Sequence, residues 1–522
     1  MIVGQGTIEG AVSQQLAGSL GGLDWGIVAG AVLLLFVISY VFGRQERDTG
    51  DFFLGGRRVP PLVACLSFVA TEISALTIVG LPHTAFTENW RWIQFIVGLA
   101  LARLIVAFLF IPAFYQYRCT SIYEFLGHRF GPATQYIGSI YFLVTRLLAS
   151  GVRLYATAMA VGTIMDWPLP ATIALFTAVS ILFIAFGGIK AVVWSGAYEA
   201  IFFVIAGALV VGYLLRHIDG GVVSALQAAH EAGRLSTFSF RLDLHDATTF
   251  WAGAASGLFI GVVSFGADQE MVQRLLTVET RRSSQKTIIS TILTVLPVYW
   301  LYLLVGTLLY VFYSQHPTLS LPQELKEIFP HFARTILPAG LKGLVLGAII
   351  MASVDSPLSS LTSSFVSDIY RPLIRKGATE KHYLLVSRLG VVGFGLLLAA
   401  IAAACSPVQN ILWFAFQIYS LTGGPLLGVF LLGLLTRHKA NRANVPAMLV
   451  STALCTVLLL LIQQGKLGLG WSWLIVIGTA TTMILGYLFG WALLYSPASF
   501  RGIPLSAFLP GKRKHGKKTT FM

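Results

Sequence analysis

Charged residues are scarce in this sequence. Only 11% of its 522 residues are charged and 56% are hydrophobic, whereas an ordinary soluble domain carries about 25% charged residues. So few charges cannot cover the apolar side chains of a soluble protein with polar surface, but a surface that faces lipid needs no such cover. Apolar stretches of roughly 20 residues, the length of a transmembrane helix, recur from Trp25 nearly to Tyr495. The composition therefore excludes a soluble globular protein and predicts an all-α polytopic membrane protein.

Several other signals are absent. The cysteines match no zinc or redox spacing and lie mostly in or beside apolar segments, so we expect no disulfide; they are Cys65, Cys119, Cys405 and Cys455. The histidines form no HExxH or Cys/His cluster, and the chain has no Walker motif. These absences argue against ATP-driven pumping and a membrane-embedded enzyme. The segment before Trp25 has no Lys or Arg and so lacks the charged start of a signal peptide.

Thirteen stretches are long and apolar enough to be transmembrane spans. We expect their boundaries to hold within about 2–4 residues. The predicted spans are 25–43, 61–82, 92–115, 134–162, 169–187, 192–215, 248–276, 287–312, 339–366, 385–404, 408–436, 444–462 and 472–494.

Lys and Arg are divided unequally between alternate loops. Of the 36 basic residues, 24 lie in one set of loops and in the C-terminal tail, and only 8 lie in the opposite loops. By the positive-inside rule the basic set is cytoplasmic, which places the N-terminus outside and the C-terminus inside. We therefore expect a multi-pass protein of the cell membrane (the inner membrane if Gram-negative). The net charge of +14 arises from these loops, so we expect the lipid bilayer, and no nucleic acid, as partner.

Polar residues at membrane depth are costly and point to function. In the second span Glu72 lies beside Ser74, and in the seventh span glycines recur from Gly257 to Gly266. Paired interruptions in corresponding spans are typical of inverted-repeat transporters. We expect the two helices to be unwound around Ser74 and around Gly261–Gly266, although the glycines alone are also compatible with close helix packing.

Glu72 allows three interpretations. An in-span carboxylate can contact a cationic substrate, carry a proton, or pair with a basic residue of another span. Its candidate partners are Arg103, Arg146 and Arg153.

Four segments follow one another in a characteristic order: Ile184 to Trp194 with its Gly-Gly pair, Asp268 to Arg274 with the pattern (Asn/Asp)-Gln-x-x-x-Gln-Arg, Ser367 to Tyr370, and Gly428 to Leu434. Together they resemble the sodium:solute symporter family. The resemblance implies a LeuT-type fold with two inverted repeats of five helices, 61–215 and 248–436. One helix, 25–43, precedes them and two, within 444–494, follow. An extracytoplasmic segment, 1–24, and a basic cytoplasmic tail, 495–522, complete the predicted organisation.

The resemblance also implies a sodium site. Its carbonyl ligands fall on Ala70, Ile73 and Ile349, and its hydroxyl positions fall on Ala352 and Ser353. Ala352 has no hydroxyl, so one family ligand is missing.

A second cation or proton site differs from the family pattern. Some members carry an Asp in the sixth span where this chain has Gly196, and their two partner hydroxyls match Asp355 and Ser356. Glu199, one turn beyond Gly196, is a further candidate. We infer that the negative charge has moved between neighbouring helices.

The substrate positions implied by the resemblance lie beside the interrupted helices. Leu76 and Ser264 replace a sugar contact and a gating aromatic of sugar-transporting members, so a close match to those members is not expected. The full set is Glu72, Ser74, Leu76, Ser264, Phe265 and Gln417.

The sequence thus predicts a secondary active transporter, not an enzyme, that couples symport of a small organic solute to a cation by alternating access. Sodium is the expected coupling ion, and no other metal or cofactor is predicted. Two alternatives stay open. One is proton coupling through Glu72 or Asp355, and the other is a transporter-like solute sensor without net transport, against which the short tail argues.

Overall fold

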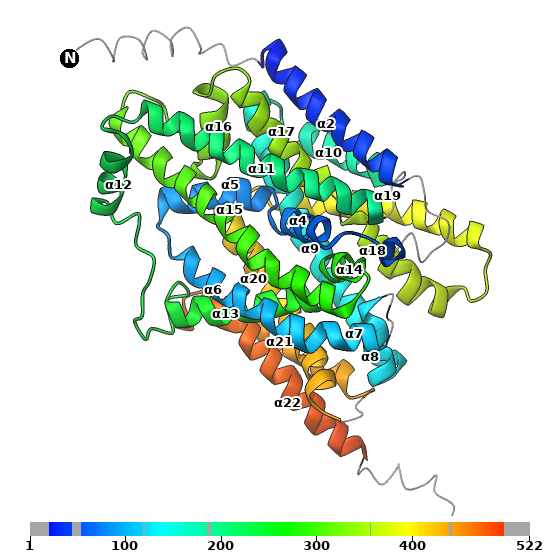
Figure 1. Cartoon of the computed structure of the whole chain (residues 1–522). Helices are drawn as coiled ribbons and strands as arrows, with labels where there is room; N and C mark the ends of the chain where they lie inside the picture. Colours follow the sequence, from blue (N-terminus) through cyan, green and yellow to red (C-terminus); the bar gives the residue numbers. More distant parts are fainter. Residues whose placement is uncertain are drawn as a thin grey trace, which may run out of the picture.

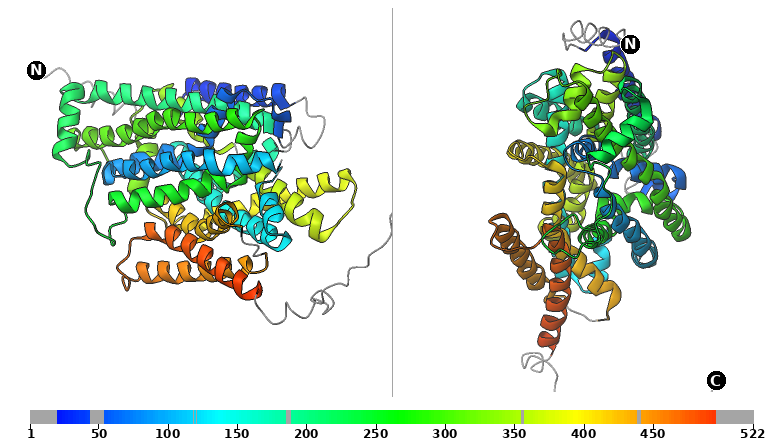
Figure 2. Two further views of the ribbon diagram at one scale, coloured as in Figure 1. Left: turned by 60° about the horizontal axis from the view of Figure 1, so that its bottom comes forward. Right: turned by 90° about the vertical axis from the view of Figure 1, so that its left-hand side faces the viewer.

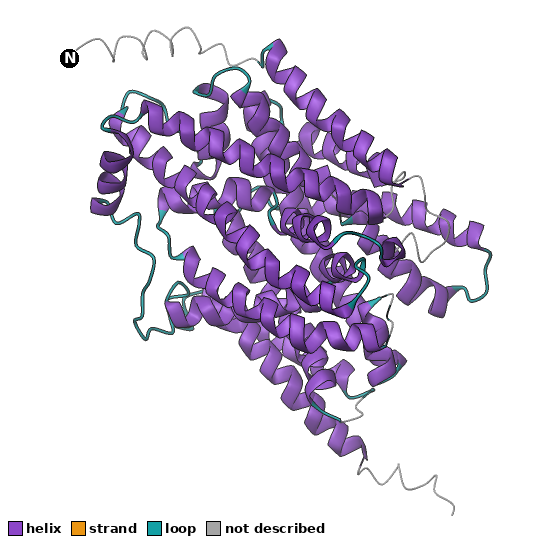
Figure 3. Ribbon diagram, in the orientation of Figure 1, coloured by secondary structure: helices purple, strands orange, loops and turns teal. Residues whose placement is uncertain are grey.

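The computed structural model describes residues 20–43, 54–117, 119, 121–184, 189–354, 357–437 and 441–494, and these form helices and connecting turns without a strand (Figure 3). Within them, nine helices are long and apolar enough to cross a membrane, or eleven if each of two bent pairs is one span. The nine are α2 (Gly22–Gly43), α6 (Trp92–Ile105) continued by η2 (Val106–Phe110) and α7 (Ile111–Gln116), α9 (Pro132–Met165), α11 (Ile189–His217), α15 (Arg281–Gln315), α19 (Glu380–Ala404), α20 (Ile411–Leu435), α21 (Asn444–Gln463), and α22 (Leu474–Leu494) preceded by η5 (Trp471–Trp473).

The predicted all-α membrane fold is confirmed, but the count of thirteen spans is not. Two predicted spans correspond to the shorter apolar helices α10 (Leu169–Ile184) and α17 (Leu341–Val354), which run up to residues outside the described part. The remaining short elements are η1 (Gly55–Arg57), α8 (Ile122–Arg129), α12 (Gly221–Glu231), η3 (Leu325–Glu327), α16 (Ile328–Thr335), α18 (Leu358–Ser364) and η4 (Phe365–Ile374).

The helices form one bundle, with α2 at one edge and α21 and α22 at the opposite edge (Figures 1 and 2). The first helix packs on α11 and α17, and the last packs on α20 and α21. Asp24 fixes α2 in place, because its Oδ1 accepts hydrogen bonds from the N–H groups of Gly340 and Gly343, each 2.8 Å long, at the start of α17. A carboxylate there satisfies N–H groups that a helix start leaves without partners.

Two spans are broken. Helix α4 (Pro61–Glu72) meets α5 (Ala75–Thr87) at a bend of 55°, and α13 (Phe250–Gly266) meets α14 (Gln269–Leu276) at 59°. The first break lies at Ser74, as predicted. The second prediction was wrong in position, because the helix continues through Gly266 and the break lies at Ala267 and Asp268. Asp268 is responsible for this placement, since its side chain caps α14 by accepting a 3.0 Å hydrogen bond from the Glu270 N–H.

The glycines of α13 serve helix packing instead. A Cβ atom at Gly257 would lie 2.1 Å from the Phe95 carbonyl oxygen of α6, and one at Gly98 would lie 2.1 Å from the Ala254 carbonyl oxygen. The two backbones therefore touch directly, as small residues permit in membrane bundles.

The four cysteines all lie within the described residues. Each is buried and free, in agreement with the expectation that no disulfide forms.

Candidate functional site

A cavity beside both helix breaks holds about 910 Å³ of empty space, including the open space at its mouth. Five of the six predicted substrate positions line it, namely Glu72, Ser74, Leu76, Ser264 and Phe265. The sixth, Gln417, is half-buried and is not among the lining residues, because α20 presents another face to the cavity. The side chains on that face are Leu412, Ala415, Phe416 and Tyr419.

Glu72 at the first break is held by two neighbouring helices. Its Oε2 lies 2.5 Å from Nη2 of Arg103 on α6, and its Oε1 accepts a 2.6 Å hydrogen bond from the Tyr299 hydroxyl on α15. Arg103, one of the three arginines expected as partners, pairs with it. The geometry therefore favours the interpretation of Glu72 as a structural partner.

The second break carries a denser ionic cluster. Oδ2 of Asp268 lies 3.2 Å from Nη1 of Arg146 on α9 and accepts a 3.3 Å hydrogen bond from the Tyr419 hydroxyl on α20. Arg146 also pairs with Glu270, whose other oxygen lies 3.8 Å from Arg274. The family-like segment that starts at Asp268 thus joins α14 to the helices around it.

Two guanidinium groups and two carboxylates of the described residues line the cavity, namely those of Arg146, Arg153, Glu72 and Asp268. Arg153 lines it and donates a 3.2 Å hydrogen bond to the Thr71 carbonyl.

The first break frees the two carbonyls that the family resemblance assigns to sodium. In an unbroken helix the Ser74 N–H would donate to the Ala70 carbonyl, but here it donates to the Glu72 carbonyl at 3.2 Å. Likewise the Thr77 N–H, which would donate to the Ile73 carbonyl, donates to the Ser74 carbonyl at 2.8 Å. Both carbonyls have lost their helical donors, and carbonyl oxygens suit a hard cation.

The remaining predicted ligands lie on α17. Ile349 and Ala352 are buried, and α17 packs against α5, which begins just after the break. Ser353 belongs to the same helix, but its side chain lies outside the described part of the structure, as do Asp355 and Ser356. The assignment of these residues to cation sites stays a prediction.

Gly196 and Glu199 lie on α11, which packs against both α4 and α17. A Cβ atom at Gly196 would lie 2.7 Å from the Ser67 hydroxyl oxygen, so the helices leave little room for a carboxylate there. Glu199 is buried with 2% of its surface exposed. It therefore stays a candidate for the second site.

A larger polar cavity, with about 1330 Å³ of empty space, lies toward the end of the bundle that is predicted to face outward. A narrow gap lined by Leu76, His83 and Lys326 lies between the two cavities. Lys326 donates hydrogen bonds to the carbonyls of Ser406 (3.1 Å) and Val408 (3.0 Å). This side chain lies on the path that would join the two cavities.

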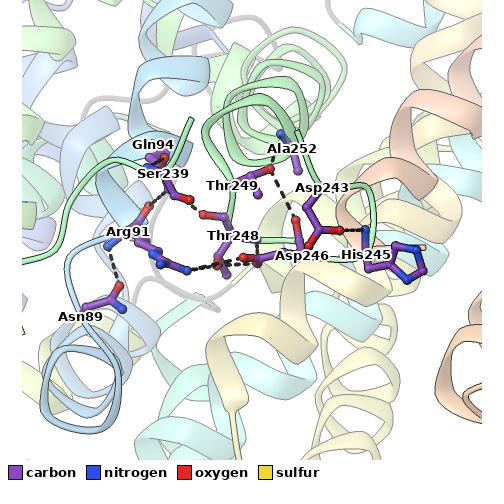
Figure 4. Close-up of polar contacts among 10 residues, drawn as sticks. All are labelled: Asn89, Arg91, Gln94, Ser239, Asp243, His245, Asp246, Thr248, Thr249 and Ala252. Atoms are coloured by element: carbon purple, nitrogen blue, oxygen red, sulfur yellow. Dashed lines mark hydrogen bonds and ion pairs between the residues drawn. The ribbon is translucent and has the colours of Figure 1, made fainter. Parts of the chain in front are cut away.

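The connection between α12 and α13, residues 232–249, is held against the start of α6 by polar contacts (Figure 4). Nη1 of Arg91 lies 3.5 Å from Oδ2 of Asp246, and the Gln94 side chain donates a 2.6 Å hydrogen bond to the Thr248 carbonyl. Partial burial acts to raise the pKa of Asp246, but the hydrogen bonds from Thr248 and the charge of Arg91 outweigh it and leave the pKa below its ordinary value.

Comparison with known proteins agrees with this architecture. A model of the sodium:solute symporter family matches residues 52–450, more than half of the chain. The chain belongs to the sodium:solute symporter family, whose members are cation-coupled secondary transporters.

Two bacterial relatives match almost the whole chain. The sodium/sialic acid symporter SiaT of Proteus mirabilis is 28% identical over 92% of this chain and 96% of its own, and the sodium/sialic acid symporter NanT of Aliivibrio fischeri is 29% identical over 90% and 94%. The human sodium-coupled monocarboxylate transporter 1 is 27% identical over 79% of this chain and 69% of its own.

Solved structures share the fold. A substrate-bound, outward-open Na⁺-coupled sialic acid symporter matches with a TM-score of 0.79 and 26% identity, covering 91% of this chain and 99% of that one. Inward-facing Mhp1 matches with a TM-score of 0.52 and 15% identity, covering 85% of this chain and 94% of that one, which shows the fold alone. The expected LeuT-type fold is confirmed.

Sequence reasoning missed the roles of Tyr299 and Tyr419. Both hydroxyls bond a buried carboxylate beside a break. A buried tyrosine usually finds a hydrogen-bond partner for its hydroxyl, but the sequence does not identify that partner.

Proposed function

We propose that this transporter uses the sodium gradient to drive uptake of a small organic anion. The observation that carries the proposal is the first helix break, where two backbone carbonyls without helical donors lie next to a cavity. Sodium prefers oxygen ligands of this kind. The sodium dependence named for the relatives supports the same coupling ion.

The guanidinium groups of Arg146 and Arg153 on the cavity wall, together with the solutes named for the relatives, support an anionic substrate. Guanidinium groups bind carboxylates with charge-assisted hydrogen bonds. Sialic acid and monocarboxylates, the solutes named for the relatives, both carry a carboxylate.

Uptake into proteoliposomes tests this proposal. With an inward sodium gradient, we expect accumulation of a radiolabelled carboxylate solute from a panel that includes sialic acid, short monocarboxylates and neutral sugars. Accumulation should cease when a sodium ionophore collapses the gradient. Sodium-independent accumulation, or accumulation of neutral solutes alone, would contradict the proposal.

Arg153→Gln tests the charge argument separately. The variant removes one guanidinium group from the cavity wall, so we expect a higher anion concentration for half-maximal uptake. Stabilisation of the purified protein by sodium should be unchanged, because that measurement needs no solute. Equal solute affinity in the variant and the parent would remove Arg153 from the substrate site.

A further inference from the structure

Both carboxylate oxygens of Glu72 are engaged by side chains rather than directed at a ligand. One binds Arg103 and the other binds Tyr299, and only 8% of the Glu72 side chain is exposed. A buried ion pair contributes little net stability, because desolvation offsets the attraction between the charges. The pair is better explained by the geometry that it fixes.

Arg103 is itself fixed at every nitrogen. Its Nε donates a 2.9 Å hydrogen bond to the Thr291 hydroxyl, its Nη1 donates a 2.9 Å hydrogen bond to the Leu99 carbonyl, and its guanidinium lies 4.3 Å from the centre of the Phe265 ring. The arginine thus connects α6 to α15 and to α13. Glu72 is anchored to a rigid point shared by three helices.

Glu72 is also the last residue of α4, and its backbone makes the break. Its carbonyl oxygen accepts the hydrogen bond from the Ser74 N–H that would go to the Ala70 carbonyl in an unbroken helix. If the Glu72 side chain were released, α4 could extend by a turn and the carbonyls of Ala70 and Ile73 could return to helical bonding. The anchored side chain therefore keeps both carbonyls without helical donors.

We infer that Glu72, Arg103 and Tyr299 form a positioning triad that holds the first helix break open for the coupling cation. The inference rests on the proposed sodium coupling and assigns Glu72 neither to the solute nor to a proton. Groups that fix metal ligands from outside strongly affect metal affinity. Loss of one triad contact should therefore weaken sodium binding without touching a ligand.

Tyr299→Phe and Glu72→Gln are the test variants, and Tyr302→Phe is the matched control. Tyr302 lies one turn along α15, is equally buried, and donates a 3.1 Å hydrogen bond to the Phe203 carbonyl, away from the break. Sodium binding is measured as sodium-dependent thermal stabilisation of purified protein, and uptake is measured at saturating sodium.

We expect Tyr299→Phe to raise the half-maximal sodium concentration about ten- to hundredfold, since it removes one hydrogen bond to a charged group. Glu72→Gln should have at least as large an effect. Tyr302→Phe should stay within about twofold of the parent, the small change expected when no contact at the break is lost. At saturating sodium, Tyr299→Phe, which leaves every charged group around the cavity in place, should keep the parent's solute affinity and the shape of its pH profile.

Other outcomes overturn the inference. A flattened pH profile in Glu72→Gln would make Glu72 a proton carrier, and an altered solute affinity at saturating sodium would make it a substrate contact. Unchanged sodium affinity in the two triad variants, with a sodium-dependent parent, would refute the triad alone. A parent that does not respond to sodium would refute the proposed coupling and the triad together.

Discussion

Replacing Gly257 by Ala should damage the contact between α6 and α13. The added methyl group would lie 2.1 Å from the Phe95 carbonyl oxygen and 3.0 Å from its carbonyl carbon. Since heavy atoms of this kind prefer separations of about 3.5 Å, the two backbones must move apart by roughly 1.4 Å. Both obstructing atoms belong to a helix backbone, so no rotamer change can make room.

Two opposing effects determine how much stability the substitution removes. Overpacking of a close-packed interface costs about 1–3 kcal/mol, whereas removing a glycine from a helix interior contributes about 0.5–1 kcal/mol of stability. Overpacking dominates, and we expect a net loss of about 1–2 kcal/mol. The assay is the apparent melting temperature of the purified protein in detergent, which should fall.

Gly212→Ala is the matched control, because Gly212 lies on α11 with no atom within 4 Å of an added Cβ. It gains the same helix propensity without a clash, so its melting temperature should equal or exceed that of the parent. If Gly257→Ala has the same melting temperature as Gly212→Ala, the backbones of α6 and α13 are not in direct contact and the packing argument fails.

Three further predictions concern the cation sites and the connection between α12 and α13. Ser353→Ala should weaken the sodium dependence of uptake, since it removes the predicted hydroxyl ligand; an unchanged sodium titration would place the pocket elsewhere. Asp355→Asn should lower sodium affinity if the carboxylate binds sodium, or flatten the pH dependence of uptake if it carries a proton; a variant equal to the parent in both titrations would assign it only to hydration of the cytoplasmic vestibule. Because the folded-state pKa of Asp246 is lowered, its stabilising contribution is complete above its ordinary value and is lost as the pH falls through the folded pKa. After correction for intrinsic rates, the backbone amides of residues 239–249 should therefore be equally protected from exchange at pH 5 and pH 8. Their exchange should be faster in Asp246→Asn than in the parent. Equal exchange in the variant and the parent would show that Arg91 does not hold the loop in place through Asp246.

The sequence predicted the bundle because its signals are local. Long apolar runs and the polar interruption at Ser74 correspond directly to α-helices and to the first break. The second break was misplaced because glycine has two uses in a membrane helix, as a weak point and as a contact surface. Which use applies at Gly261 depends on α6, where Ala102 lies against it. No property of the seventh span alone contains that information.

The site was only partly predictable for a similar reason. The family resemblance identified five cavity-lining residues, which lie on the broken helices beside the cavity. The partner of Glu72 could not be predicted from the sequence, because Arg103, Arg146 and Arg153 were equivalent candidates until the arrangement of the helices was known. Charge partners across a bundle are set by helix rotation and depth.

The burial of all four native thiols gives the protein a useful chemical property. Membrane-impermeant maleimides should react with the parent chain slowly or not at all, because Cys405, the most accessible of the four, has only 5% of its surface exposed. A single cysteine introduced at Leu242, which is 89% exposed, should then take up a fluorophore selectively in the unaltered background. Paired labels of this kind can follow opening and closing of the bundle in real time, without first replacing side chains that pack inside it.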